Sequence, residues 1–156
     1  MSDITVQPIN ILIADDDEDD LFFATKALKE SRLQNNVFCV YDGVELMDFL
    51  HKRGSFTEAT APTPDLILLD LNMPKKNGRE ALKEIRADEN LNQIPIVILT
   101  TSEAEQDIVA SYKLGANSYI KKPVDFEGLV ELMRVLKTYW VQFVKLPPND
   151  SKRDIG

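Results

Sequence analysis

Short apolar runs alternate with amphipathic segments along residues 9–146 of the chain. The apolar runs are Ile9–Ala14, Val37–Tyr41, Leu66–Asp70, Ile96–Thr100 and Ser118–Lys121. Three of these runs are nearly continuous aliphatic stretches, which is typical of parallel strands that helices cover on both faces. The alternation therefore predicts five strands that are joined as βαβ units into one parallel sheet.

The segments between these runs have the character of amphipathic helices. They are Asp19–Arg32, Gly43–Lys52, Gly78–Asp88, Ala104–Leu114 and Asp125–Lys145. In the first of them, Leu21, Ala24 and Leu28 have the i, i+3, i+7 spacing of a buried helix face. Right-handed crossovers would place such helices on both sides of the sheet, so we expect a doubly wound, three-layer α/β/α domain.

Three segments fall outside this pattern. Residues 1–8 form an N-terminal extension, and Arg53–Pro64, which contains two prolines and a glycine, is expected to be a long exposed connection. Residues 147–156 have the polar composition of a disordered tail. We therefore expect one folded domain over residues 9–146.

Composition and charge narrow the class of protein. The 156 residues suit one domain, and 44% apolar with 28% charged residues is ordinary for a globular protein. The net charge of −8 disfavours nucleic-acid binding, because such a chain repels the phosphate backbone. The sequence shows neither a signal peptide nor a membrane span, so a cytoplasmic protein is expected. The single Cys39 excludes an internal disulfide and is interpreted as a small buried hydrophobic residue.

Acidic residues stand where two of the predicted strands end. Asp15 and Asp16 follow the first apolar run, and Asp70 is the last residue of the third. Because ligands of parallel sheets bind beyond the carboxyl ends of the strands, these three carboxylates should meet at one edge. Like charges at such a distance repel one another, and a hard dication relieves the conflict. An all-oxygen environment of this kind suits Mg²⁺.

A hydroxyl and an ammonium group follow the next two strands. The fourth run ends at Thr100, and Lys122 follows the fifth. Each residue alone has an ordinary explanation, since acids after a strand are often helix caps. Together, the metal and the lysine would balance the charge of phosphoryl oxygens and the hydroxyl would hydrogen-bond one of them, with Asp70 as the nucleophile.

The motifs ILIADDDED, LILLDLNMPKKNG, PIVILTTS and ANSYIKKP occur in this order along the chain. Together they strongly resemble the receiver domains of response regulators, from about Ile9 to Tyr139. The resemblance implies a flavodoxin-like (βα)5 fold with strand order 2-1-3-4-5. It also implies a signalling protein of a two-component system rather than an enzyme with its own substrate.

The resemblance assigns roles to the residues at the strand ends. Asp70 would be the phosphoacceptor, and Lys122 would contact the phosphoryl group. Asp15, Asp16 and Asp70 would hold Mg²⁺ together with the backbone carbonyl of Asn72.

Further residues would modulate the site by the same resemblance. Thr100 would be the switch hydroxyl, and Tyr119 the aromatic residue that couples to it. Asn72 and Ser102 occupy positions similar to those that tune hydrolysis of the phosphoryl group. The Lys122–Pro123 peptide is often cis in such proteins. Asp17 is interpreted as the start of the following helix.

The phosphoryl donor and the output are expected to lie in other proteins. The sole histidine, His51, is interpreted as a solvated helix-end residue, and the phosphodonor histidine of this family belongs to a separate kinase. The chain after Pro123 is too short for a DNA-binding domain beside the last helix. We therefore expect a single-domain regulator that signals through protein contacts.

The last predicted helix has more apolar surface than one sheet face requires. One stripe consists of Leu129, Met133, Leu136, Trp140 and Val144, and a second of Leu132, Val135, Tyr139 and Phe143. Either the helix packs against the sheet and its neighbour, or it contributes to a homodimer anchored near Tyr139 and Trp140. The whole chain looks most similar to single-domain regulators that are paired with bacterial and cyanobacterial phytochrome histidine kinases, which commonly dimerise.

Two other functions compete with this interpretation. An aspartyl-phosphate hydrolase would also use a strand-end aspartate and Mg²⁺, but that class needs a second acid two residues after the nucleophile. Here that residue is Asn72. A binding module that is never phosphorylated is the other alternative, and the complete set of site residues gives it no support.

Overall fold

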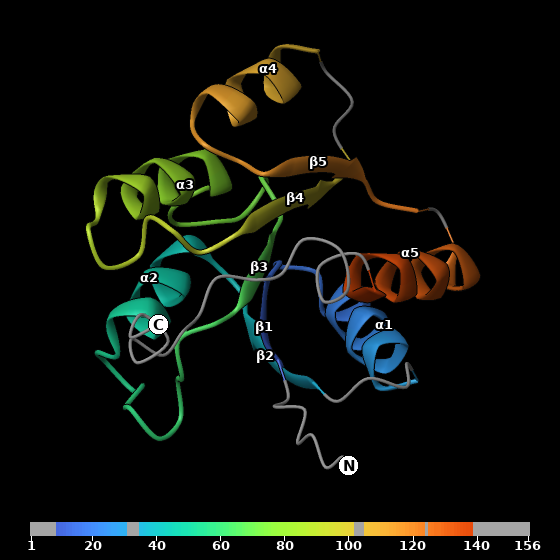
Figure 1. Cartoon of the computed structure of the whole chain (residues 1–156), viewed down its shortest axis with the longest axis horizontal. Helices are drawn as coiled ribbons and strands as arrows, with labels where there is room; N and C mark the ends of the chain where they lie inside the picture. Colours follow the sequence, from blue (N-terminus) through green and yellow to red (C-terminus); the bar gives the residue numbers. More distant parts are fainter. Residues whose placement is uncertain (1–8, 31–34, 102–104, 124, 139–156) are drawn as a thin grey trace, which may run out of the picture.

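The computed structural model describes residues 9–30, 35–101, 105–123 and 125–138. Five strands form one parallel sheet in the order β2-β1-β3-β4-β5, as expected (Figure 1). The strands are β1 (Ile9–Ala14), β2 (Asn35–Val40), β3 (Leu66–Leu69), β4 (Ile96–Thr100) and β5 (Ser118–Lys121). The order reverses beside β1, which pairs with both β2 and β3. A crevice at the carboxyl ends of β1 and β3 follows from this topology.

Within these described ranges, five helices flank the sheet. They are α1 (Glu18–Lys29), α2 (Gly43–His51), α3 (Gly78–Ala87), α4 (Glu105–Lys113) and α5 (Phe126–Thr138). Helices α1 and α5 lie side by side on one face, whereas α2 and α3 cover the other (Figure 1). Helix α4 lies beside β5. The observed layers confirm the expected doubly wound α/β domain.

Each strand divides its side chains between two cores. Ile11 and Ile13 of β1 pack with α1 and α5, whereas Leu12 and Ala14 pack with α2 and α3. This two-residue alternation explains why the sequence shows a continuous aliphatic run, because both faces of the strand are buried. The sheet is thereby held from both sides, and its strand ends are placed rigidly.

Side-chain caps fix where several helices begin. Asp17 accepts hydrogen bonds from the backbone N–H groups of Asp19 and Asp20, and this confirms its expected role at the start of α1. Asp42 accepts from the N–H of Glu45 at α2. Asn77 and Glu80 cap each other's backbone at α3. Each cap satisfies donors that the first helical turn leaves without an intrahelical partner.

Some boundaries differ from the prediction. Strand β2 begins at Asn35 and ends at Val40, because polar residues can start an edge strand whose outer side is open. Strand β3 ends at Leu69, so Asp70 stands just past it. Helix α1 begins and ends earlier than predicted. The predicted end of the last helix, the tail and the N-terminal extension lie outside the described residues.

The segment Arg53–Pro64 is a long, mostly exposed connection into β3, as expected, but two of its side chains also reach the core. Ala61 is fully buried, and Phe56 packs against Phe49 with 5.2 Å between the ring centroids. Lys52 ends α2 in a left-handed conformation, and its Nζ donates to the Ala61 carbonyl at 2.8 Å. The segment is therefore anchored to the α2 side of the core by apolar packing that its composition conceals.

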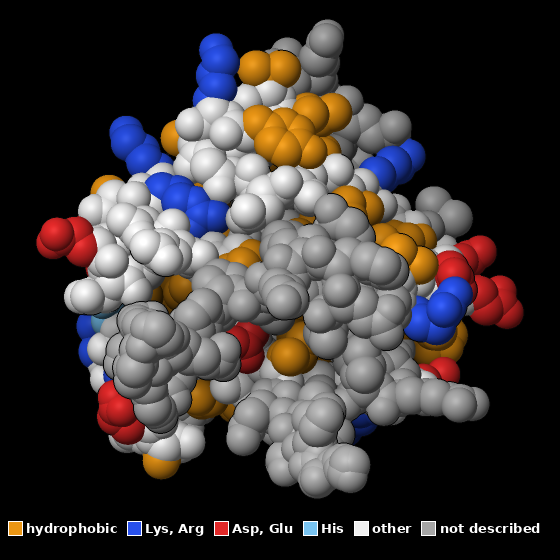
Figure 2. All heavy atoms as spheres, in the orientation of Figure 1, with side chains coloured by type: hydrophobic (Ala, Val, Ile, Leu, Met, Phe, Trp, Pro, Cys, Tyr) orange, Lys and Arg blue, Asp and Glu red, His pale blue; other side chains and the backbone are white. Residues whose placement is uncertain are grey.

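Apolar side chains also remain exposed on several of the described helices, including α4 and α5. Val109 and Tyr112 of α4 and Val135 of α5 are each about half exposed. Figure 2 shows apolar side chains gathered at the top of this view, where α4 lies. Within the described residues, none of the helices has the length and apolarity that a membrane crossing requires.

Candidate functional site

Three carboxylates meet where β1 and β3 end. The backbone N–H of Asp70 donates to the Ala14 carbonyl at 2.9 Å, which continues the pairing of β3 with β1. Asp15 and Asp70 are only 4% and 7% exposed, whereas Asp16 is exposed. Oxygen atoms of the three side chains lie within 4.8 Å of one another. The convergence predicted for these acids is confirmed.

Backbone groups hold the two buried carboxylates in place. Oδ1 of Asp15 accepts the N–H of Asp17 at 2.9 Å, and Oδ1 of Asp70 accepts the N–H of Asn72 at 3.1 Å. Gly78 passes so close to the Asp70 carbonyl that a Cβ there would collide with it. The Gly78 N–H also donates to the Leu71 carbonyl at 2.9 Å. The loop after β3 is thus folded tightly against its own start.

Lys122 binds this cluster with its ammonium group. Its Nζ lies 2.6 Å from Oδ2 of Asp15 and 3.0 Å from Oδ2 of Asp70, as the strand-end pattern predicted. A third partner, Oδ2 of Asp20, lies at 2.7 Å. The sequence interpretation missed Asp20, because an acid in the first turn of a helix already has an explanation in the helix dipole. Its place within the run Asp15–Asp20 was the only signal for it.

Burial and ion pairing have opposite effects on the pKa values of Asp15 and Lys122. Burial raises the pKa of Asp15 to about 6, even though the hydrogen bond and the charge of Lys122 lower it. For Lys122 burial lowers the pKa, but its bonds to Asp15 and Asp20 outweigh burial and raise it. The ammonium therefore stays charged at neutral pH. The acids around it are crowded, and more positive charge would stabilise them.

Thr100 and Tyr119 occupy the neighbouring strands. Thr100 is fully buried at the end of β4, and its carbonyl accepts the Lys122 N–H at 2.8 Å. Tyr119 pairs in register with Ile98 of β4 and is partly buried against the core. The phenolic hydroxyl of Tyr112 accepts the backbone N–H of Tyr119 at 3.1 Å. Thr100 and Tyr119 thus lie on the two strands that precede Lys122 at this edge of the sheet, and Lys122 is the residue that contacts the acids.

Other expectations have mixed outcomes. No peptide bond between described residues is cis, so the Lys122–Pro123 peptide is trans and the expectation of a cis bond is wrong. His51 is exposed at the end of α2, as expected, with Nε2 3.6 Å from Oδ2 of Asp88. Ser102 lies outside the described residues. The metal-ligand role of the Asn72 carbonyl stays a prediction.

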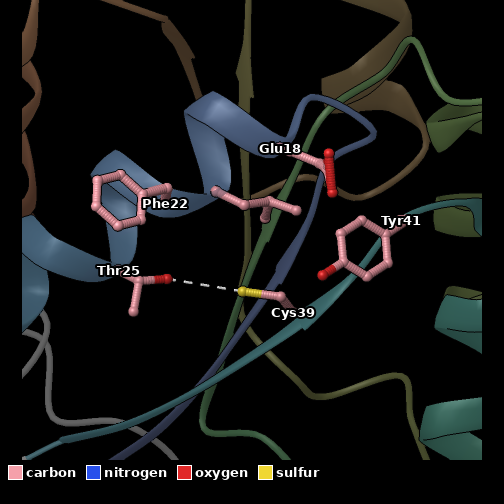
Figure 3. A pocket seen from close by; sticks show the side chains of 6 residues that line it. Glu18, Phe22, Thr25, Cys39 and Tyr41 are labelled. Carbon is pink, nitrogen blue, oxygen red and sulfur yellow. Dashed lines mark hydrogen bonds between the residues drawn. The ribbon is translucent and has the colours of Figure 1, made fainter.

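A separate hollow of about 260 Å³ lies between α1 and the end of β2 (Figure 3). Glu18, Phe22 and Tyr41 line it, and Sγ of Cys39 lies 3.7 Å from Oγ1 of Thr25. Cys39 is partly rather than fully buried, and its burial raises the pKa of the thiol. A thiol with a raised pKa is a poor nucleophile at neutral pH, which agrees with a packing role for Cys39.

Comparison with known proteins decides the family. Residues 11–134 match the sequence profile of the response regulator receiver domain. The chain belongs to the response regulator receiver family. Since this match covers most of the chain, the acids at the ends of β1 and β3 belong to the acidic pocket of a receiver domain.

Similar proteins refine this assignment. The receiver domain is 39% identical over 147 residues to the response regulator Rcp1 of Synechocystis. The aligned region covers 94% of this chain and 99% of Rcp1. The structure of Rcp1 with Mn²⁺ bound superposes with a TM-score of 0.82 at 38% identity, over 90% of this chain and all of Rcp1. The structure of the phosphorylated cyanobacterial phytochrome response regulator RcpA superposes with a TM-score of 0.85 at 39% identity, over 91% of this chain and all of RcpA. This receiver domain is therefore similar to single-domain regulators along nearly its whole length.

The donor set of the receiver domain fits a hard divalent cation. Asp15, Asp16 and Asp70 offer only carboxylate oxygens, and the exposed position of Asp16 leaves the cluster open to solvent on one side. Oxygen-only sites of this kind suit Mg²⁺ or Mn²⁺, whereas soft metals prefer sulfur or imidazole ligands. The receiver domain thus provides a metal-compatible acidic pocket with a lysine already at its edge.

Proposed function

We propose that this protein accepts a phosphoryl group on Asp70 from a partner histidine kinase. The observation that carries the proposal is the Lys122 ammonium group, whose Nζ lies 3.0 Å from Oδ2 of Asp70 and 2.6 Å from Oδ2 of Asp15. It places a positive charge beside the Asp70 carboxylate, which the backbone N–H of Asn72 and a tight loop hold in position. Such preorganised charge is the main catalytic resource in phosphoryl transfer.

The proposed metal is Mg²⁺, held by Asp15, Asp16 and Asp70 with the backbone carbonyl of Asn72. The carboxylates of these residues are the oxygen-rich cluster described above. When bound, Mg²⁺ would neutralise the carboxylates and the developing charge on the phosphoryl oxygens. The similarity to Rcp1, which was solved with Mn²⁺, supports a divalent cation at this place.

The residues of the chain divide the chemistry among them. A carboxylate oxygen of Asp70 attacks phosphorus, forming an O–P bond while the bond from phosphorus to the donor's histidine nitrogen breaks. Lys122 pairs with an oxygen of the transferred group, and the Thr100 hydroxyl donates to another. Tyr119, on the strand next to Thr100, would report the change to the surface. The burial of Asp70 strengthens these interactions, because the local dielectric is low.

A histidine kinase is the proposed partner, and similarity to the phytochrome regulator RcpA favours a phytochrome kinase. The signal would leave through protein contacts in the cytoplasm, without nucleic acid or membrane. Exposed Val109, Tyr112 and Val135 offer apolar contact area for such partners. A homodimer through the final helix is part of this proposal, and its aromatic anchors Tyr139 and Trp140 lie outside the described residues.

An aspartyl-phosphate hydrolase is disfavoured by Asn72. A general acid two residues after the nucleophile would have to protonate the leaving group, and the Asn72 side chain cannot ionise. We therefore propose a signalling protein that supports only its own phosphorylation and dephosphorylation.

One experiment separates these functions. The protein is incubated with Mg²⁺ and acetyl phosphate, and its intact mass is measured with Asp70→Asn as the control. A single phosphate adduct in the wild type that the variant lacks supports the proposal. Rapid release of phosphate from simple esters would support a hydrolase. A wild type that gains no adduct would support a binding module instead.

A further inference from the structure

The Lys122 ammonium group is shared among three carboxylates. Its Nζ has three N–H donors, and Oδ2 atoms of Asp15, Asp20 and Asp70 lie at 2.6, 2.7 and 3.0 Å. Asp15 and Asp70 belong to the cluster with metal-ligand geometry, whereas Asp20 does not. Two of the three partners of the lysine are therefore groups that a cation would also need.

Asp20 differs from the other two partners in its surroundings. Its side chain is 39% exposed, compared with 6% for Asp15 and 9% for Asp70. It stands in the first turn of α1, where its backbone N–H donates to Oδ1 of Asp17 at 3.2 Å. The cap fixes the backbone of Asp20 at the mouth of the pocket. The lysine thus has two acceptors inside the pocket and one at its rim.

This arrangement creates a competition for the buried acids. A dication at Asp15 and Asp70 would repel the ammonium group and would bind the same two carboxylates. If these two were the only acceptors, the ammonium group would have to stay beside them and would repel the bound cation. Asp20 offers an alternative acceptor that keeps the ammonium group charged, paired and close to Asp70.

We propose that Asp20 is a positioning residue, which draws the ammonium of Lys122 toward the rim and so lets a divalent cation and a phosphoryl group share the pocket with it. This inference rests on the proposed phosphoacceptor function and adds to it a residue that acts only through Lys122. Asp20 itself touches neither the metal nor the reacting atoms.

The first test measures Mg²⁺ affinity by isothermal titration calorimetry on the whole protein. Asp20→Ala should weaken Mg²⁺ binding about fivefold, the size expected for one partly exposed ion pair. Asp19→Ala is the matched control, because it removes an exposed charge from the same helical turn. It should change the affinity less than twofold, since long-range effects between exposed charges are screened.

Coupling to the lysine gives the decisive comparison. In a Lys122→Met background, which removes the ammonium group and keeps the stem, Asp20→Ala should have no more effect than Asp19→Ala. An Asp20→Ala effect of undiminished size in that background would overturn the inference, because Asp20 would then act on the cation directly. Equal effects of Asp20→Ala and Asp19→Ala in the wild-type background would overturn it as well, and this comparison needs no lysine variant.

A second readout is the rate of adduct formation with acetyl phosphate at saturating Mg²⁺. Asp20→Ala should slow it about tenfold, as for the loss of one charge-assisted hydrogen bond, and Asp20→Asn, which keeps an acceptor oxygen, should restore it to within about threefold. A rate unchanged in Asp20→Ala would overturn the inference. A wild type that binds no Mg²⁺ and gains no phosphate would instead refute the proposed function, so the two failures are distinguishable.

Discussion

The buried charge of Asp15 predicts that the site destabilises the metal-free protein. Burial raises the pKa of Asp15 from 3.8 to about 6. Each pKa unit corresponds to about 1.4 kcal/mol, so the ionised Asp15 costs about 3 kcal/mol of folding free energy at neutral pH. Asp15→Asn removes this cost. The amide cannot accept both the Asp17 N–H and the Lys122 ammonium, so the loss of one hydrogen bond offsets part of this benefit. We expect the free energy of unfolding to rise by about 1 to 3 kcal/mol in total.

The dependence on pH fixes the sign of this effect. The folded-state pKa of Asp15 lies above the unfolded value, so protonated Asp15 favours folding below pH 3.8, and that contribution is lost as the pH rises through about 6. The stability of Asp15→Asn relative to the wild type should therefore increase between about pH 4 and 7 and stay constant above that range. Mg²⁺ should stabilise the wild type but not the variant. At a Mg²⁺ concentration of about 100 times its dissociation constant, the wild type should gain about 2.7 kcal/mol of unfolding free energy.

Urea unfolding in EDTA at a series of pH values measures this difference. Asp19→Asn, an exposed acid in the same segment, should stay within about 0.5 kcal/mol of the wild type throughout. An Asp15→Asn variant that is less stable than the wild type at pH 7.5 without metal would show that ionised Asp15 does not destabilise the fold. A difference that does not change with pH would show that the cost does not arise from ionisation.

Further predictions concern the surroundings of the site. Gly78→Ala should lower the free energy of unfolding by about 2 kcal/mol or more and slow adduct formation, because its Cβ would collide with the Asp70 carbonyl. A variant that unfolds and forms the adduct like the wild type would contradict the tight loop. Asp17→Ala should lower stability by about 1 kcal/mol in urea unfolding through loss of the α1 cap, and an unchanged midpoint would show that the cap is dispensable. Cys39 should react with iodoacetamide much more slowly in the native protein than in urea, and equal rates would contradict its burial and raised pKa. Light scattering at micromolar concentration should show a dimer for the wild type and a monomer for Trp140→Ala, whereas two monomers would remove the proposed interface.

The fold could be predicted from sequence because burial on both faces leaves an unambiguous pattern. The aliphatic runs at Ile9–Ala14 and Ile96–Thr100 correspond to β1 and β4 with the predicted bounds. The start of β2 could not be predicted in this way, since Asn35 and Asn36 are polar and an edge strand tolerates such residues. Phe56 and Ala61 were missed because a turn-rich composition says nothing about which single side chains are buried.

The candidate site was predictable where the topology alone brings residues together. Asp15, Asp70 and Lys122 each follow a strand, and parallel strands end at one edge of the sheet. Asp20 was not predictable, because it meets Lys122 only through the orientation of α1, across 102 positions of sequence. The role of Gly78 also depends on how closely two parts of one loop pass, which residue spacing does not reveal.

Asp70 is the proposed receiver of the phosphoryl group, and this assignment can be tested by chemical trapping. After reaction with acetyl phosphate and Mg²⁺, borohydride reduces an aspartyl phosphate to homoserine, and tandem mass spectrometry of the peptides locates the modified residue. We expect homoserine at position 70 alone, and only when Mg²⁺ is present. Homoserine at Asp15 or Asp16, or a phosphate that resists borohydride and maps to a serine or threonine, would contradict this assignment.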